Sequence, residues 1–92
     1  MKAGTRVRVT KKDAEKPRED MPNGYWVEGV LVLDLKVGRR ILVDRKIRNG
    51  IEIDGVFESS LVVMIQWQNP VEVTTQNSTW LVEEVADVAG TT

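Results

Sequence analysis

A cluster of basic side chains between positions 36 and 48 is the part of the sequence best suited to bind an anionic molecule. Its members are Lys36, Arg39, Arg40, Arg45, Lys46 and Arg48. Arginine forks pair with phosphate oxygens through two hydrogen bonds, and several such contacts hold a nucleic-acid backbone. The rings of Tyr25, Trp26 and Trp67 would add stacking faces for unpaired bases. The cluster predicts a nucleic-acid interface; the alternative interpretation is a set of charges that keeps an edge hairpin soluble.

A second candidate site is centred on Trp67. Gln66, Gln68 and Asn69 surround this tryptophan with polar residues close to a turn, so we expect its ring to be exposed. Exposed Trp and Arg side chains dominate the binding energy of protein interfaces. We therefore predict a protein-contact tip made by Trp67, Gln66 and Gln68 together with Tyr25. The alternative is a tryptophan ring folded back over the end of the domain.

Several classes of chemistry are missing from the sequence. It contains no Cys and no His, which removes thiolate metal sites, disulfides, cysteine nucleophiles and the most common general base. No glycine-rich phosphate loop, nucleophile elbow or metal-ligand spacing occurs in it. We therefore expect no enzyme activity, no metal and no cofactor.

Charge is distributed unevenly along the chain. Thirteen basic and seven acidic side chains give the segment through Arg48 a net charge of +6, and seven acidic side chains give the remainder −7. The basic half of one copy could attract the acidic half of another, which leaves a homo-oligomer open as an alternative. The net acidic total argues against a dedicated nucleic-acid-binding protein.

The elements that must position these residues are β-strands. Val and Ile are abundant, and no window shows a helical stripe with a period of 3.6 residues. The expected strands cover residues 5–10, 25–35, 39–46, 56–66, 71–75 and 79–85, with a short alternating segment at 51–53. Residues 1–92 fit a single domain. We predict an all-β fold, a small SH3-like or OB-like barrel of five to seven short antiparallel strands.

Glycine and asparagine mark where the chain should turn or bend. Asn49-Gly50 suits the positive φ angles of a type I′ hairpin. We expect Gly29 to bend a long strand and Gly55 to form a bulge. Further turns are predicted at residues 36–38, 69–70 and 76–78.

Two segments are expected outside the barrel. Residues 11–23 carry eight charged side chains and two prolines, and they predict a mobile charged loop, with a short helical turn over 12–16 as the alternative. Residues 86–92 are predicted to be a frayed tail. The sequence opens with no signal-like segment, and its longest apolar run, 61–65, is too short to span a bilayer, so we expect a cytoplasmic protein with no membrane contact.

Two segments of the second half match a pair of short motifs, Thr-Ser-x-Val-x-x-Ile followed by Thr-x-Asn-Ser-x-Tyr-x-Leu. The matching residues are Ser60, Val62, Ile65, Thr75, Asn77, Ser78 and Leu81. Ser59 replaces a threonine of the pattern, and Trp80 replaces its tyrosine. These segments, about a quarter of the chain, resemble a pattern found in short, mostly uncharacterised bacterial and phage proteins. The resemblance implies a small β domain, often phage-associated, and no activity.

The same residues also have a purely structural interpretation. Ser59-Ser60 would start a strand and bond local backbone groups through their hydroxyls. Asn77-Ser78 would make a turn, and Trp80, alternating with Val82, would enter the core.

Taken with the resemblance, the residues predict a non-enzymatic binding protein. We expect a phage or mobile-element accessory protein that binds and regulates a host macromolecule, with a protein as partner. The alternatives are a small nucleic-acid-binding barrel that uses the 36–48 hairpin and a homo-oligomeric structural subunit.

Overall fold

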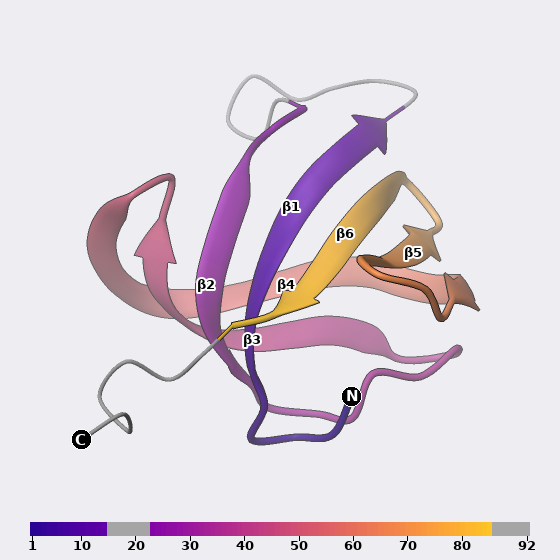
Figure 1. Cartoon of the computed structure of the whole chain (residues 1–92), viewed down its shortest axis with the longest axis horizontal. Helices are drawn as coiled ribbons and strands as arrows, with labels where there is room; N and C mark the ends of the chain where they lie inside the picture. The colour runs from indigo at the N-terminus through magenta and orange to yellow at the C-terminus, as the bar shows by residue number, and fades with distance from the viewer. Residues whose placement is uncertain (15–22, 86–92) are drawn as a thin grey trace.

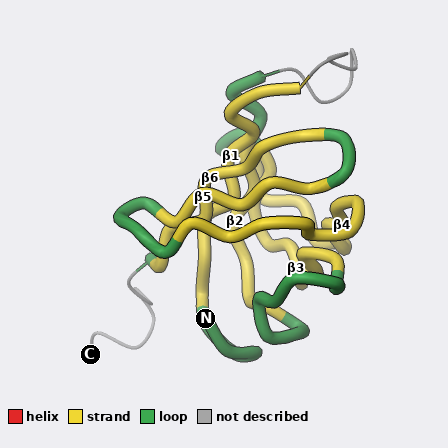
Figure 2. The backbone as a smooth tube through the Cα atoms, turned by 90° about the vertical axis from the view of Figure 1, so that its right-hand side faces the viewer, coloured by secondary structure: helices red, strands yellow, loops and turns green. Residues whose placement is uncertain are grey.

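Six antiparallel strands wrap into one closed sheet in the computed structural model, which describes residues 1–14 and 23–85 (Figure 1). The strands are β1 (Arg6–Ala14), β2 (Trp26–Leu31), β3 (Arg40–Arg48), β4 (Ile51–Gln66), β5 (Val71–Thr75) and β6 (Ser78–Glu84). Each strand pairs with the next, and β6 pairs with β1 to close the barrel. No helix occurs among the described residues (Figure 2), so none there is long and apolar enough to cross a membrane. The predicted small all-β barrel is confirmed.

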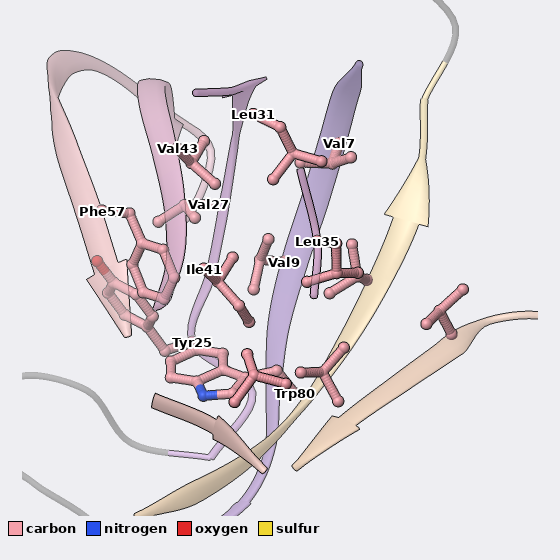
Figure 3. Close-up of a cluster of buried hydrophobic side chains, with 14 residues drawn as sticks. Val7, Val9, Tyr25, Val27, Leu31, Leu35, Ile41, Val43, Phe57 and Trp80 are labelled. Atoms are coloured by element: carbon pink, nitrogen blue, oxygen red, sulfur yellow. The ribbon is translucent and has the colours of Figure 1, made fainter. Parts of the chain in front are cut away.

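The barrel interior is filled by the inward side chains of all six strands. On β1 the alternation of Arg6 to Val9 places Val7 and Val9 inside, as predicted. Trp80 also lies in the core, where its ring meets the ring of Phe57 edge to face with centroids 5.0 Å apart (Figure 3). This packing removes the apolar surfaces of Phe57 and Trp80 from water and is a main source of stability.

Two glycines allow the long strands to bend as the sequence predicts. The pairing register of β2 with β3 shifts between Glu28 and Gly29, where a side chain would collide with the Asp44 backbone. In the β3–β4 pair, Arg45 lies opposite Gly55 and the register shifts immediately beyond. The strands therefore curve at these two positions and close the ring.

The predicted turns are present. Asn49 and Gly50 have φ angles of 49° and 85° and link β3 to β4, as a type I′ hairpin requires. Asn49 also accepts a hydrogen bond at Oδ1 from the Trp26 backbone N–H, at 2.9 Å. Gly38, with a φ angle of 89°, makes the turn after Lys36 possible.

Several predicted boundaries are wrong. β1 continues to Ala14, so residues 11–14 belong to a strand and not to a charged loop or a helical turn. β2 ends at Leu31 instead of reaching Leu35, and the segments at 51–53 and 56–66 form one continuous strand. The rest of the predicted mobile loop, residues 15–22, and the predicted tail, residues 86–92, lie outside the described residues.

Candidate functional site

The predicted basic cluster is divided between the two ends of β3. Lys36 and Arg39 lie in the turn before the strand and Arg40 begins it, whereas Lys46 and Arg48 lie near its far end. Eight residue steps separate Arg40 from Arg48, which is roughly 26 Å along an extended strand. These side chains do not form one continuous basic patch.

Much of the positive charge in this cluster is already engaged. Arg40 donates to the Ser59 carbonyl at 3.1 Å and lies 3.9 Å from the Glu58 carboxylate. Lys46 lies 3.6 Å from the carboxylate of Asp44 and 3.9 Å from that of Asp54.

Arg45 has a structural position. Its guanidinium donates to the carbonyls of Ile53 and Asp54, at 3.3 and 3.5 Å. Ile53 and Asp54 have no pairing partner in β3, because they lie at the register shift before Gly55. The Arg45 guanidinium therefore donates hydrogen bonds to backbone carbonyls and is not available to bind a phosphate.

Lys36, Arg39 and Arg48 are the exposed members of the cluster that form no ion pair within residues 1–14 and 23–85. Arg48 lies at the hairpin end of β3, far from the other two. Lys36 and Arg39 flank the turn at Gly38, which is hydrogen-bonded to β4 at Val62.

The predicted exposure of Trp67 is confirmed, and its contact with a protein partner stays a prediction. Trp67 follows β4 with 61% of its surface exposed, and Gln66 and Gln68 on either side are exposed as well. Tyr25 was expected to join them, and this is wrong: it is only 5% exposed and belongs to the core. Tyr25 and Val27 face inward on alternate positions, so Trp26 between them faces outward.

Trp26 also offers less open ring surface than a stacking platform needs. It is half-buried, and the guanidinium carbon of Arg8 lies 4.3 Å from its ring centroid. Arg8 is held there by an ion pair with Glu28. Of the three predicted stacking faces, Trp67 is the exposed one.

Four further apolar side chains in or beside β4 are exposed, which the sequence did not reveal. Together with Trp67, which follows β4, we call them the β4 apolar surface; its members are Val37, Leu61, Val63, Met64 and Trp67. The turn that carries Val37 lies beside β4, because Gly38 N donates to Val62 O and Val62 N donates to Arg39 O, both at 2.8 Å.

A bulge in β4 explains why this surface was missed. The register with β5 shifts between Val62 and Met64, and Val63 and Met64 are consequently both exposed. Strict alternation would have put one of them inside. The sequence carries no glycine or proline there to signal the shift.

Three basic side chains lie close enough to Asp34, just before the turn at Gly38, to affect its ionisation. Asp34 accepts a hydrogen bond from the Ala3 backbone N–H at 2.8 Å. That bond is the main reason why the pKa of Asp34 is lowered, and the charges of Lys36, Arg39 and Lys2 lower it further. The rim of the β4 apolar surface on this side is therefore basic.

The pKa of Asp34 provides a test of this arrangement. Since the pKa in the folded state is lowered, ionised Asp34 favours folding above the ordinary value of 3.8, and this contribution disappears as pH falls through the folded-state pKa. A carbon-detected NMR titration should give a value below 3.8. In Arg39→Gln the pKa should rise yet stay below the ordinary value, because the Ala3 hydrogen bond persists. A wild-type pKa at or above the ordinary value would contradict the arrangement.

The residues of the Ser-rich and Asn-Ser motifs come together between β4 and the β5–β6 turn. Ser59 Oγ accepts from Ile41 N at 2.9 Å and donates to Ser60 O at 2.7 Å. Ser60 Oγ accepts from Asn77 N at 3.3 Å. The predicted bonding of hydroxyls to backbone is confirmed, but the serines sit in the middle of β4, at a register shift, and do not start a strand.

The polar atoms of this region therefore have a structural role, since the serine hydroxyl replaces a ladder bond that the bulge removes. Thr75 has a similar role at the β5–β6 turn. Its Oγ1 accepts from Ser78 N at 3.3 Å and donates to Ser78 O at 3.1 Å.

Lys11 is the side chain whose position differs most from the sequence prediction. It was assigned to a solvated loop but is only 3% exposed, on the inward face of β1 after Val7 and Val9. The alternation of Val7 and Val9, continued by two residues, would have placed Lys11 inside, but the charge of the segment favoured a loop.

Comparison of the chain with protein-family models, with curated proteins and with solved structures finds no match. The function must therefore be inferred from the surfaces described above.

Proposed function

We propose that this chain is a non-enzymatic binding domain that captures a protein segment on the β4 apolar surface. The observation that carries the proposal is the exposure of five apolar side chains in or next to β4, among them Trp67 at 61% and Val37 at 60%. Exposed apolar side chains that form a patch mark interaction sites. Tryptophan is also the residue type most enriched among interface hot spots.

The surroundings of this surface indicate the chemistry of the partner. Lys36 and Arg39 are exposed beside it and form no ion pair within the described part of the chain. Gln66 and Gln68 supply neutral hydrogen-bonding groups on the side of Trp67. A partner segment with apolar anchors next to Asp or Glu side chains fits this combination. The resemblance to short phage and bacterial proteins supports an accessory role in which the partner is a host protein.

The geometry gives less support to a nucleic-acid interface. The basic cluster is split along β3, and Arg40, Arg45 and Lys46 are engaged by β4 or by Asp44. Binding of a nucleic-acid backbone requires several unpaired basic side chains along the path of its phosphates.

Self-association through opposite charges also has less support. The two halves of the sequence already meet within one barrel, where Lys12 forms an ion pair with Glu72 and Arg8 pairs in register with Glu83.

Selection from a random-peptide display library tests the proposal. Peptides enriched on the wild-type chain should combine apolar residues with Asp or Glu. Trp67→Ala should weaken their binding by about 2 kcal/mol, or roughly 30-fold, as loss of a hot spot does. Binding is measured by titration calorimetry with the synthetic peptides.

Val56→Ala is the matched control. Val56 is an exposed apolar residue of the same strand, but it lies opposite Asp44 and outside the β4 apolar surface. It should leave peptide affinity unchanged. Selected peptides that bind Trp67→Ala and wild type equally would remove the surface from consideration.

Two further measurements separate the competing functions. Sedimentation equilibrium should show a monomer, and a dimer abolished by Trp67→Ala would assign the surface to a second copy. Mobility-shift assays at low salt should show no complex with DNA or RNA. A complex that Arg39→Ala combined with Arg48→Ala weakens would favour the nucleic-acid function instead.

A further inference from the structure

Met64 is the one methionine of the β4 apolar surface. Its side chain is 47% exposed. It lies opposite Thr74 of β5, directly after the register shift that leaves both Val63 and Met64 exposed. The chain contains no Cys, whose thiolate would otherwise compete for oxidants. The Met64 thioether is therefore within reach of dissolved oxidants, at a position where the proposed partner segment would cover it.

The other two methionines of the chain differ from Met64. Met1 is partly buried and packs against the hydrophobic core, and Met21 lies outside the described residues. Oxidation of a side chain in a folded protein depends on its exposure. We expect Met64 to react faster than Met1, because the Met1 side chain is partly covered by the barrel.

Oxidation of Met64 would change the chemistry of the surface and leave the barrel intact. It converts an apolar thioether into a polar sulfoxide. In the free chain water solvates the sulfoxide, because the Met64 side chain is exposed and contributes little to the core. An apolar partner segment that covers the surface removes this water, which is costly unless a new hydrogen bond replaces it. The modification should therefore weaken binding much more than folding.

We propose that Met64 is an oxidation site whose sulfoxide form switches off binding on the β4 apolar surface. This inference rests on the proposed function. Hydrogen peroxide is the oxidant. A sulfur lone pair attacks one peroxide oxygen, and a sulfur–oxygen bond forms as the oxygen–oxygen bond breaks. The proton of the transferred oxygen passes to the departing oxygen, which leaves as water. The sulfur is oxidised by two electrons, and the peroxide is reduced by two.

The switch is reversible by a methionine sulfoxide reductase. In that reaction two thiols of the reductase are oxidised to a disulfide, and the sulfoxide oxygen leaves as water. The exposure of Met64 gives the reductase access to the sulfoxide without unfolding of the barrel. Oxidative damage at other residue types, in contrast, is not repaired by this enzyme.

The first test follows the reaction without a partner. The full-length chain is treated with hydrogen peroxide, and digested samples are analysed by mass spectrometry over time. Met64 should form its sulfoxide faster than Met1 does. At full oxidation of Met64, circular dichroism should show a Tm within about 3 °C of the untreated chain. A slower reaction at Met64 than at Met1, or a larger fall in Tm that is absent in Met64→Leu, would overturn the proposal.

The second test measures binding before and after oxidation. The probe is a synthetic peptide obtained from the display selection, and titration calorimetry gives its Kd. For wild type the Kd should rise about tenfold or more on oxidation, as burial of an unpaired polar group predicts. For Met64→Leu the Kd should be the same before and after treatment, whatever its starting value. Met21→Leu is the matched control and should show the full wild-type response.

Treatment of the oxidised wild type with a methionine sulfoxide reductase and dithiothreitol should restore the original Kd. An unchanged Kd at full oxidation of Met64 would overturn the proposal, and so would an equal rise in Met64→Leu. Either of these results leaves the proposed function in place, because the untreated chain still binds the peptide.

Retention on a phenyl matrix separates failure of this inference from failure of the proposed function. Oxidised wild type should elute earlier than untreated wild type, whereas Met64→Leu should elute at the same position before and after treatment. If the display selection yields no peptide and this shift occurs, the proposed function fails and the oxidation-sensitive surface is supported. If oxidised and untreated wild type elute together, the proposed role of Met64 is wrong.

Discussion

Gly29→Ala is expected to destabilise the barrel by about 3 kcal/mol or more, at the upper end of what overpacking causes. A Cβ atom at this position would lie 2.1 Å from the Asp44 carbonyl oxygen and 2.9 Å from the Arg45 Cα. Both are backbone atoms of the paired strand, so no rotamer change can relieve the contact. Thermal unfolding followed by circular dichroism should show a Tm lower by about 12 °C or more.

Gly55→Ala is the matched control for this prediction. Here the nearest atom to a new Cβ is Arg45 Nη2, at 2.4 Å, which is the end of a flexible side chain. The guanidinium can move away from a new Cβ, but it then loses its hydrogen bonds to the Ile53 and Asp54 carbonyls. This loss should lower the free energy of unfolding by about 1 kcal/mol. Equal losses in the two variants would mean that the close backbone approach at Gly29 is not what limits the substitution.

Trp80→Ala should cost about 3–5 kcal/mol of unfolding free energy, because it empties a core position and removes the edge-to-face contact with Phe57. Trp67→Ala should change stability by less than about 0.5 kcal/mol, since that ring is exposed. Urea unfolding of both variants measures the difference. A large loss in Trp67→Ala would place its ring in the core and remove the β4 apolar surface as a binding site.

The fold was predictable because two of its determinants are local. These are the alternation that sets which side chains of a strand face inward, and the residue types that suit a turn. The alternation of Val7 and Val9, the Asn49-Gly50 turn and the bend at Gly29 can each be identified from a few neighbouring residues, and the structure confirms all three. Tyr25 and Lys11 were assigned wrongly because residue type was given more weight than the alternation of inward and outward side chains along each strand. Tyr25 continues the inward alternation of Val27 in β2, and Lys11 continues that of Val7 and Val9 in β1.

The candidate binding surface and the burial of Lys11 were harder to predict because each depends on contacts between distant segments. Val37 joins Val63 and Met64 only through pairing of the turn at Gly38 with β4. Lys11 meets Trp80 only because β1 pairs with β6. Exposure of Trp67, by contrast, follows from its immediate neighbours and was predicted.

The pairing of β1 with β6 has a consequence for how the chain folds. Val7 lies opposite Glu84, and Val9 lies opposite Val82, so the first strand gains its second neighbour only when β6 is available. Such distant pairing must overcome a large loop-closure entropy, and proteins rich in it fold in milliseconds to seconds instead of microseconds. During synthesis on the ribosome, the apolar face of β1 stays incompletely covered until β6 has emerged. The barrel therefore completes its ring only once β6 is available, and not segment by segment.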